Sequence, residues 1–341
     1  MTPLKCTLFS KFNREEKIDI FFSTTWCRDR LFTSENPNDI LKFYNTFSSR
    51  NELIQWMEER PKGRAEIIEV EGDKEIIVVI PTADFNGKYA KECRENIFKG
   101  LHIIFVESGF PKDPYFNYAH NCNVGIKKAM EYNPKWIVVS NDDMYKIDDI
   151  KVLVKEIQML DSRKIMFVYT KPSRYHSYPS SIGRKRFVIG SLGYFVNSCI
   201  HRYPKNYLIA SKIARKYKVD FVLGPRNRLL ARVFLKDVFY FTMTSDFMIL
   251  NEKYAEQTNG SVFNEGYING TEDHELSIIA SIQSGNVDFI DYRIGDYIGS
   301  TLGVRHIRVI RDVANYVYFN YRLPLILSKG NYIYNGKFKQ M

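Results

Sequence analysis

One stretch of the chain, Trp136-Ile-Val-Val-Ser-Asn-Asp-Asp-Met144, joins the pattern of a buried strand to two adjacent carboxylates. Residues 136 to 139 are aromatic or β-branched, as in a strand that is covered on both faces. Residues 147 to 160 then repeat apolar side chains at helical spacing. Asp142 and Asp143 are therefore expected at the carboxyl end of a strand in an α/β sheet, the edge where such sheets bind ligands.

Two carboxylates at such an edge are suitable ligands for Mn²⁺ or Mg²⁺ that arrives with phosphate groups. A plainer interpretation is that Asp142 and Asp143 only cap the following helix, since Asp is a favourable N-cap residue. The stretch by itself leaves both interpretations open.

The composition excludes several classes of protein. Hydrophobic residues make up 45% of the chain and charged residues 26%, and no apolar run reaches the roughly 18 residues of a membrane-spanning helix. Residues 1–10 lack the apolar core of a secretory signal, which predicts a cytoplasmic location. The five cysteines include no Cys-x-x-Cys pair, which argues against a disulfide framework and against a zinc site.

The net charge of +10 predicts attraction to anionic partners such as nucleotide phosphates or anionic lipids. Together with 23 Tyr and 24 Phe, it also raises the question of nucleic-acid binding. Because dispersed aromatic residues usually belong to a core, we expect no nucleic-acid partner. The sequence leaves the oligomeric state open.

The order of patterns along the first half predicts a mostly parallel sheet flanked by helices. The expected elements are a strand at 18–22, a helix at 39–59, a strand at 75–80, a helix at 88–99, a strand at 101–106 and a helix at 118–132. A strand, helix, strand order requires a parallel crossover. Three strand ends, at 81–84, 107–109 and 141–143, should therefore meet at one edge.

These strand ends carry a family resemblance. Val78-Val-Ile-Pro-Thr82, Glu107-Ser-Gly109 and Asn121-x-Asn123-x-Gly125, followed by the two acids, resemble the nucleotide-binding half of GT-A glycosyltransferases, particularly family 2. The resemblance implies a GT-A fold. It also implies transfer of a sugar, with inversion, from a nucleoside-diphosphate sugar donor to a hydroxyl acceptor that is a glycan or is linked to a lipid or a protein.

The resemblance also implies residue roles. Asp143 and Asp142 would ligate the metal ion, Mn²⁺ or Mg²⁺, that bridges the diphosphate. The residues implied in nucleotide-sugar binding are Pro81, Thr82, Asp84, Glu107, Asn121, Asn123 and Asp142. The chain departs from the family at Ala83-Asp84, where an aromatic residue and Asn are usual, at Glu107 in place of Asp, and at Asn141 in place of the first acid.

The second half resembles the acceptor half of the same family, so that the likeness spans residues 75 to 300. A strand at 242–250 and a loop at 263–267 precede Thr271-Glu-Asp-His-Glu-Leu276, which opens a helix. The resemblance makes Asp273 the general base, with Glu272 beside it, and inverting transfer needs a carboxylate that takes the proton of the acceptor hydroxyl. A capping box with Thr271 as N-cap is compatible with this role. His274 is expected to be structural.

The expected domain organisation has three parts. Residues 1–72 would be an N-terminal extension packed on the core. Residues 73–303 would be the catalytic domain, with a nucleotide-binding half at 73–150 and an acceptor half at 151–303. Residues 304–341 would be a basic aromatic helix and a tail, whose pattern of Arg among apolar residues resembles helices that lie on a membrane surface.

Three interpretations stay open. The C-terminal helix fits packing on the domain as well as contact with the inner face of a membrane. A nucleotidyltransferase would use a similar sheet, but residues 83–87 are not the Gly-rich Arg/Lys loop that it would carry after its first strand. Asn141 keeps open a catalytically inactive protein that only binds nucleotide sugars.

Overall fold

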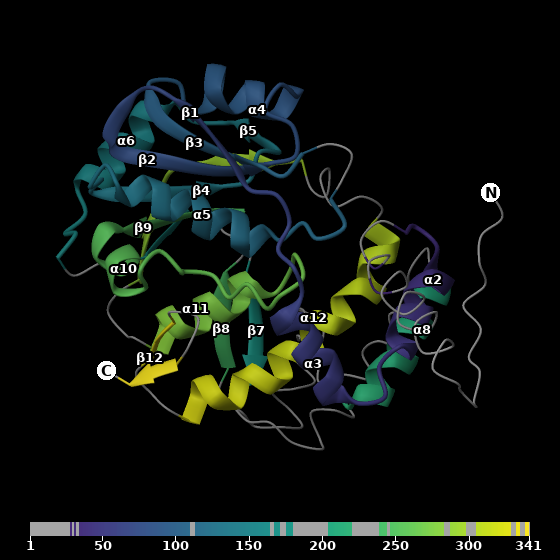
Figure 1. Ribbon diagram of the computed structural model, residues 1–341. Coiled ribbons are helices and arrows are strands. Elements are labelled where there is room, and N and C mark those ends of the chain that lie inside the picture. The colour runs from purple at the N-terminus through teal and green to yellow at the C-terminus, as the bar shows by residue number, and fades with distance from the viewer. Residues whose placement is uncertain are drawn as a thin grey trace.

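Among the described residues, seven strands form one sheet at the centre of the fold (Figure 1). In their order across the sheet they are β1 (Glu66–Val70), β3 (Leu101–Glu107), β2 (Asp73–Thr82), β4 (Trp136–Ser140), β9 (Phe247–Asn251), β6 (Phe167–Thr170) and β10 (Val287–Ile290). The computed structural model describes residues 28, 31, 34–109, 113–163, 167–170, 175–179, 204–219, 239–243, 246–282, 287–297, 305–328, 332–334 and 338–340.

The sheet is mixed. β3, β2 and β4 are neighbours that pair in parallel, and β10 pairs in parallel with β6. β1 runs antiparallel to β3, and β9 runs antiparallel to both of its neighbours, β4 and β6. The expected α/β class is confirmed, and β1 and β9 are the strands that run against the others.

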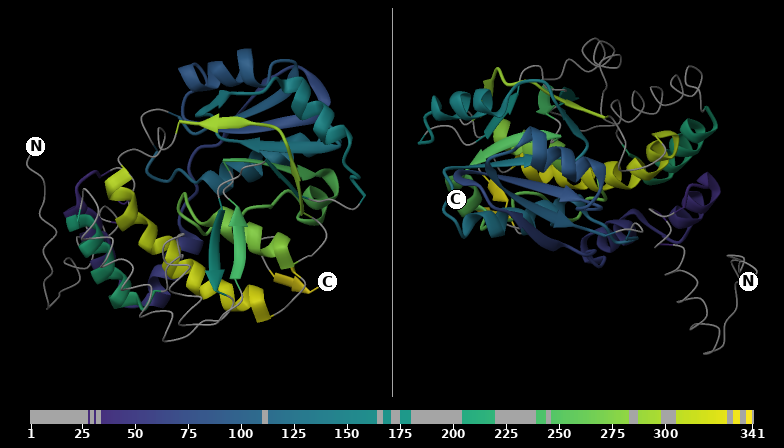
Figure 2. Two further views of the ribbon diagram at one scale, coloured as in Figure 1. Left: turned by 180° about the vertical axis from the view of Figure 1, so that it is seen from behind. Right: turned by 90° about the horizontal axis from the view of Figure 1, so that it is seen from above.

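Helices cover both faces of this sheet (Figures 1 and 2). On one face lie α4 (Lys88–Glu92), its π-helical continuation η1 (Cys93–Ile97) and α6 (Ile150–Gln158). On the other lie α5 (Tyr118–Met130), α10 (Glu252–Gln257) and α11 (Glu272–Ile282). Residues of β2 alternate between the two cores, with Val78 on the first and Val79 on the second. A strand covered in this way needs apolar side chains on both faces, which explains the apolar run in its sequence.

Gly125 allows α5 to approach the sheet closely. A Cβ atom at this position would lie 2.4 Å from Val79 Cγ1 and 2.9 Å from Val106 Cγ2. These valines belong to β2 and β3, whose carboxyl ends carry candidate functional residues. The glycine therefore sets the distance between α5 and the strands that position the site.

A separate core, to which α11 also contributes Ile278 and Ile279, joins four helices that lie beside the sheet in Figures 1 and 2. They are α2 (Pro37–Asn45), α3 (Arg50–Glu59), α8 (Pro204–Tyr217) and α12 (Arg305–Ser328). Buried Tyr44 holds α2 to α12: its hydroxyl donates to Ile310 O at 2.7 Å and accepts from Ala314 N at 2.9 Å. None of the described helices combines the length and the apolar character that crossing a bilayer requires.

The apolar side of α12 is buried inside the protein. Ile310, Val313 and Val317 are fully covered within the four-helix core, and the guanidinium of Arg311 donates to Ser34 O at 2.7 Å. These apolar side chains are therefore not available to enter a lipid headgroup layer. The buried side of α12 gives no support to the predicted membrane contact, which stays a prediction.

Two elements that the sequence pattern predicted as single are divided. The helix expected at 39–59 is α2 followed by α3, because Ser49 Oγ accepts from Glu52 N at 3.2 Å and starts a new helix. The strand expected at 242–250 is β8 (Phe239–Met243) followed by β9. Hydrophobic periodicity continues past Ser49, so it could not reveal the first break. Before β9 the apolar residues are interrupted by Thr244-Ser-Asp246, which the expected strand included.

Three further expectations differ from the observed elements or fall outside them. The helix expected at 147–160 is shorter and begins at Ile150, after Asp149 accepts from Lys151 N. Residues 144–146, which precede the expected helix, form strand β5. β1 lies within the segment expected to be an N-terminal extension, yet it is an edge strand of the sheet. The strand expected at 18–22 lies outside the described residues.

The remaining strands form two-stranded pairs, all antiparallel. They are β5 (Met144–Lys146) with β11 (Ile294–Asp296), β7 (Tyr175–Pro179) with β8, and β12 (Tyr332–Tyr334) with β13 (Phe338–Gln340). The loop expected at 171–202 on the acceptor side is described only at β7. Of these pairs, β5 with β11 directly continues the chain from Asp143.

Replacing Gly125 by Ala is expected to lower the free energy of unfolding by about 1 to 3 kcal/mol, because the added methyl group overlaps two valines. This loss should appear even though Ala gains roughly 1 kcal/mol over Gly in a helix. Urea unfolding measures it. Adding Val79→Ala should recover part of the loss, and Lys127→Ala, at an exposed position of α5, should change little. An unchanged or raised stability in Gly125→Ala would contradict the close approach.

Candidate functional site

The centre of the candidate site is the hydrogen bond between the ends of β2 and β4. Thr82 Oγ1 donates to Asp142 Oδ2 at 2.7 Å. Thr82, Asp142 and Asp143 are all buried. Because β2 and β4 are parallel neighbours, their carboxyl ends lie side by side, and the two acids follow β4 directly. The structure thus brings together Thr82, Asp142 and Asp143, as the sequence predicted.

Glu107 joins this group at the end of β3. It pairs with Thr82 in the register of the two strands. Its Oε2 accepts from Phe85 N at 2.9 Å, and its Oε1 lies 3.5 Å from a guanidinium nitrogen of Arg64. The carboxylate of Glu107 therefore ties the loop after β2 to the end of β3.

Pro81 and Asp84 lie at the carboxyl end of β2, the first within the strand and the second in the turn that follows it. Asp84 is exposed and begins a turn, in which Oδ1 accepts from Asn86 N and the carbonyl oxygen accepts from Gly87 N. Pro81 is buried in β2 and lies beyond the last residue that pairs with β4, so its missing N–H costs this pairing nothing. Both residues lie at the same edge as Thr82.

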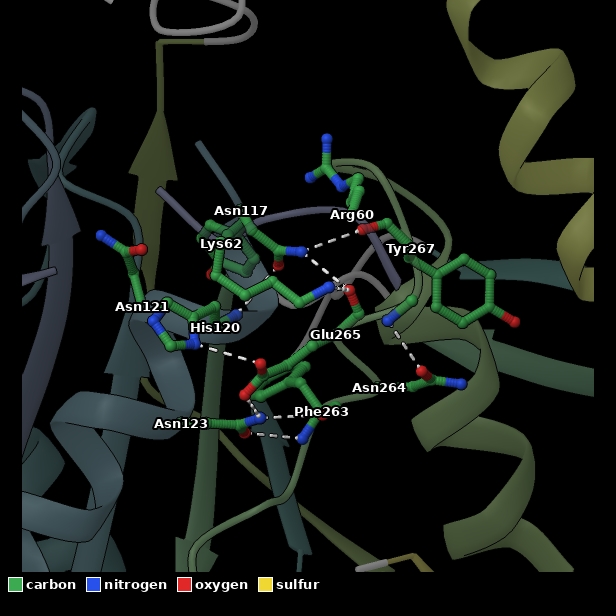
Figure 3. A network of polar contacts seen from close by, with 12 residues as sticks. Arg60, Lys62, Asn117, His120, Asn121, Asn123, Phe263, Asn264, Glu265 and Tyr267 are labelled. Carbon is green, nitrogen blue, oxygen red and sulfur yellow. Dashed lines mark hydrogen bonds and ion pairs between the residues drawn. The ribbon is translucent and has the colours of Figure 1, made fainter. Parts of the chain in front are cut away.

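The two asparagines of α5 differ in their contacts. Asn123 donates to Phe263 O and to Glu265 Oε1, both at 2.9 Å, and accepts from Phe263 N at 2.9 Å (Figure 3). Asn121 Nδ2 makes long bonds of 3.4 Å to Arg64 O and Val106 O, and its buried Oδ1 has no hydrogen-bond partner among the described residues. Asn123 is thus engaged by a loop of the protein itself, whereas Asn121 lies under the end of β3.

That loop, residues 261–271, leads from α10 to the acids at the start of α11. Polar side chains from α5 and its N-cap residue point toward it, as Figure 3 shows for His120, Asn123 and Asn117. Asn117 Nδ2 donates to Glu265 O at 2.8 Å, and His120 Nδ1 lies 3.0 Å from Glu265 Oε2. Hydrogen bonds to the His120 and Asn123 side chains help to lower the pKa of Glu265, against burial, which raises it.

A second set of contacts holds the loop from α12 and α11. The amide of Asn315 accepts from Ile268 N at 2.7 Å and donates to Ile268 O at 3.0 Å. Buried Glu275 accepts from Tyr267 Oη at 2.7 Å and forms an ion pair with Arg322 at 2.8 Å. Backbone groups in an irregular buried loop need such partners, because no strand or helix supplies them.

The loop ends in a strained residue and then delivers the two acids. Thr271 has φ 78°, a left-handed conformation that is uncommon for a β-branched residue and that the surrounding contacts must hold. Glu272 is buried, and its Oε2 accepts from Gly270 N at 2.7 Å. The side chain of Asp273 keeps 16% of its surface exposed. Asp273 is thus the more accessible carboxylate of the pair.

The environment shifts the pKa values of both neighbours of Asp273, Glu272 and His274. Burial, and then the charge of Asp273, raise the pKa of Glu272 to about 8. Burial, and then the charge of Arg308, lower the pKa of His274 to about 3. At neutral pH Glu272 is therefore protonated and His274 is neutral. A buried carboxyl group whose pKa is raised in this way is a common feature of sites that move protons.

Tyr118 and Asp246 connect the two clusters of acids. Tyr118 is partly buried, and burial is the main cause that raises the pKa of its hydroxyl, to which the charges of Glu272 and Asp246 also contribute. The carbonyl of Asp246 accepts from Asn141 N at 2.9 Å. Because β9 runs against β4, the residue before β9 lies at the edge where β4 ends. The sequence patterns missed Asp246, which the apparent strand at 242–250 concealed.

Asp142 and Asp143 fit a metal of the Mg²⁺ or Mn²⁺ class as protein ligands. The described residues contain no group of three or more His, Cys, Asp or Glu that could hold a metal. Such ions often bind through one or two carboxylates and complete their shell with water and substrate phosphates. Asp296 lies close by, since it pairs with Met144 in the ladder of β11 and β5. The oxygen ligands thus suit a metal that binds together with a phosphate.

Comparison with protein-family models and with curated proteins finds no match to this chain. The geometry of this edge and the order of motifs in the sequence are therefore the features that indicate a function.

The free energy of unfolding of the wild type is expected to fall as the pH rises, and replacing Glu272 by Gln should abolish this fall. Between an unfolded pKa near 4.5 and the folded pKa of about 8, the unfolded chain has released the proton that the folded protein still holds. The free energy of unfolding of the wild type therefore falls over this range. Relative to the wild type, Glu272→Gln should gain roughly 2 kcal/mol or more from pH 5 to pH 9.

Urea unfolding at both pH values measures this difference. Glu256→Gln, at an exposed position of α10, is the matched control and should follow the wild type. If the free energy of unfolding of Glu272→Gln changes with pH as that of the wild type does, Glu272 does not keep its proton in the folded protein.

Proposed function

We propose that the protein is a GT-A glycosyltransferase that transfers a sugar, with inversion, from a nucleoside-diphosphate sugar to a hydroxyl group. The observation that carries the proposal is the Thr82 to Asp142 hydrogen bond, which joins the ends of two central parallel strands beside Asp143. Ligands of open α/β sheets bind at this edge. The order of motifs that resembles family 2 supports the same assignment.

The donor would lie across the ends of β3, β2 and β4. Thr82, Asp84 and Glu107 would meet the nucleoside, because they end β2 and β3 or follow them. Asp142 and Asp143 would hold a divalent metal ion, and that ion would neutralise charge on the leaving diphosphate. Asn121 has a buried carbonyl oxygen available under the end of β3, whereas Asn123 would act by positioning the 261–271 loop.

Asp273 is the proposed general base. It would accept the proton of the acceptor hydroxyl while the acceptor oxygen bonds to the anomeric carbon of the sugar. The bond between that carbon and the diphosphate oxygen would break on the opposite side, and its electron pair would leave with the diphosphate. Protonated Glu272 would keep a second negative charge away from Asp273, because burial holds its pKa at about 8.

The acceptor would be a glycan or a group linked to a lipid or a protein. It would approach from the side of α11, because Asp273 stands at the start of that helix. The anionic partners that the charge of +10 favours include the diphosphate of the donor and the head groups of anionic lipids. A peripheral position on the inner face of a membrane is part of the proposal and would use surfaces other than the buried side of α12.

The first test measures the thermal midpoint of the protein with UDP, GDP, dTDP or CMP, each with Mn²⁺ or with EDTA. A ligand that binds only the folded state raises the midpoint. We expect one nucleotide to raise it in a Mn²⁺-dependent way in the wild type. We expect no such rise in Asp143→Asn, because the metal loses a charged ligand. Asp161→Asn, a matched change in a surface ion pair, should respond as the wild type does.

The absence of any nucleotide response in the wild type would remove the main support for the proposal. A response that persists in Asp143→Asn, or that is the same in EDTA, would leave nucleotide binding but reject the metal role of Asp143.

The second test concerns turnover. In Asp273→Asn the nucleotide response should persist, since Asp273 is not among the proposed donor ligands. Release of nucleoside diphosphate from the matching nucleotide sugar should fall by about 10²- to 10⁴-fold, the usual contribution of a general base. A coupled assay for the released diphosphate measures it. A wild type that binds the nucleotide sugar but releases none would instead indicate an inactive binding protein.

A further inference from the structure

Three tyrosine side chains gather beside Asp143, and we call them the tyrosine platform. Tyr89 belongs to the first turn of α4, Tyr145 is the central residue of β5, and Tyr297 directly follows β11. The ring of Tyr297 lies between the other two, with ring centroids 5.0 Å from Tyr145 and 6.0 Å from Tyr89. Three segments that are distant in sequence thus contribute one aromatic cluster.

Backbone contacts connect the platform to the proposed metal ligand. Tyr297 N donates to the carbonyl oxygen of Asp143 at 2.8 Å. Tyr145 comes two residues after Asp143 and pairs with Gly295 across the two strands. Figure 1 shows β5 and α4 close together at the same end of the molecule. The platform is therefore continuous with the edge where the donor diphosphate is proposed to bind.

Gly295 makes room for one of the rings. A Cβ atom there would lie 2.1 Å from Cζ of Tyr145. The ring of Tyr145 therefore lies directly against the backbone of β11, and this contact restricts its position. The platform is thus built by the fold and does not consist of side chains that extend singly into solvent.

Two rings of the platform are exposed although they are aromatic, and Tyr89 is half-buried. Tyr145 keeps 38% of its surface accessible and Tyr297 keeps 51%, whereas Tyr44 and Tyr267 are fully buried. Large aromatic side chains dominate the energetics of cores and interfaces, and their exposure beside a site commonly marks a place where a ligand covers them. A cation lies over one of the rings, since Lys88 Nζ is 4.6 Å from the ring centroid of Tyr89.

The chemistry of the rings fits a saccharide. An aromatic face carries partial negative charge, and a pyranose ring presents a face of C–H bonds whose hydrogens carry partial positive charge. The tyrosine hydroxyl groups can also exchange hydrogen bonds with sugar hydroxyls. A nucleobase could stack on the same rings, but its proposed position is at the ends of β2 and β3.

We propose that Tyr89, Tyr145 and Tyr297 form a saccharide-binding platform on which a sugar ring stacks next to Asp143. This inference rests on the proposed function and deepens it, because it assigns the sugar, as distinct from the nucleotide, to named residues. The sugar ring belongs either to the donor or to the acceptor, and the same chemistry recognises both. Tyr297 contributes most, since it lies between the other rings and exposes more surface than Tyr145.

The experiment compares Tyr297→Ala and Tyr297→Phe with the wild type by titration calorimetry in Mn²⁺. The probes are UDP and UDP-glucose, or the corresponding pair for the nucleotide that the thermal panel selects. If the donor sugar stacks, Tyr297→Ala should weaken binding of the nucleotide sugar by roughly three- to tenfold and leave the nucleoside diphosphate unchanged. Tyr297→Phe keeps the ring and should retain most of the affinity. Tyr321→Ala, at an exposed tyrosine of α12, is the matched control.

The acceptor arm uses maltose and cellobiose as free saccharide probes, with saturation-transfer NMR as the readout. If the acceptor sugar stacks, the wild type and Tyr321→Ala should transfer saturation to a disaccharide and Tyr297→Ala should not. Equal weakening of the nucleoside diphosphate and the nucleotide sugar would assign the rings to the nucleobase and overturn the proposal. No change in either arm would overturn it as well.

Failure of the proposed function can be distinguished from failure of the platform. A wild type that binds no nucleotide but shows saturation transfer that depends on Tyr297 would retain the platform and reject the glycosyltransferase. Because Tyr297 is half exposed, its replacement should leave the thermal midpoint of the free protein unchanged.

Discussion

The arrangement of the site depends on the parallel pairing of β2 with β4 and on the hydrogen bond from Thr82 to Asp142 at its end. A buried carboxylate is costly unless a donor satisfies it, and the hydroxyl at the end of the neighbouring strand is such a donor. Both strands are buried on their two faces, so their ends cannot shift independently. The acids are held where the sheet opens to ligands, and β5, which carries one ring of the tyrosine platform, continues directly from them.

The second element of the site depends on polar contacts within the interior. The 261–271 loop has no regular structure of its own, yet much of it is buried. Its backbone groups bond to Asn117, the N-cap residue of α5, to Asn123 of α5 and to Asn315 of α12. Amide side chains suit this task, because each offers both a donor and an acceptor. The result is a rigid connection that brings Glu272 and Asp273 to the start of α11.

The central sheet was largely predictable, because buried parallel strands give long apolar runs and the connecting helices give a different period. β2, β3 and β4 and the acids after β4 were found in this way, and so was the position of Glu107 beside Thr82. The break at Ser49 was missed because it depends on a local hydrogen bond within a continuous apolar pattern. The break before β9 was missed because the polar residues Thr244-Ser-Asp246 were included in one expected strand. Asp246 was missed for the same reason.

The sequence alone determined that a buried strand of an α/β sheet would be followed by Asp142 and Asp143, because the alternation and length of apolar runs dictate which residues must be buried. Only the tertiary structure decided which distant groups meet there. It engaged Asn123 with the 261–271 loop, placed the apolar side of α12 in a core with α2 and α8, and gathered Tyr89, Tyr145 and Tyr297 beside Asp143. The reason is that such contacts join residues far apart in the chain, and packing of the whole molecule selects them, whereas local periodicity carries no record of them.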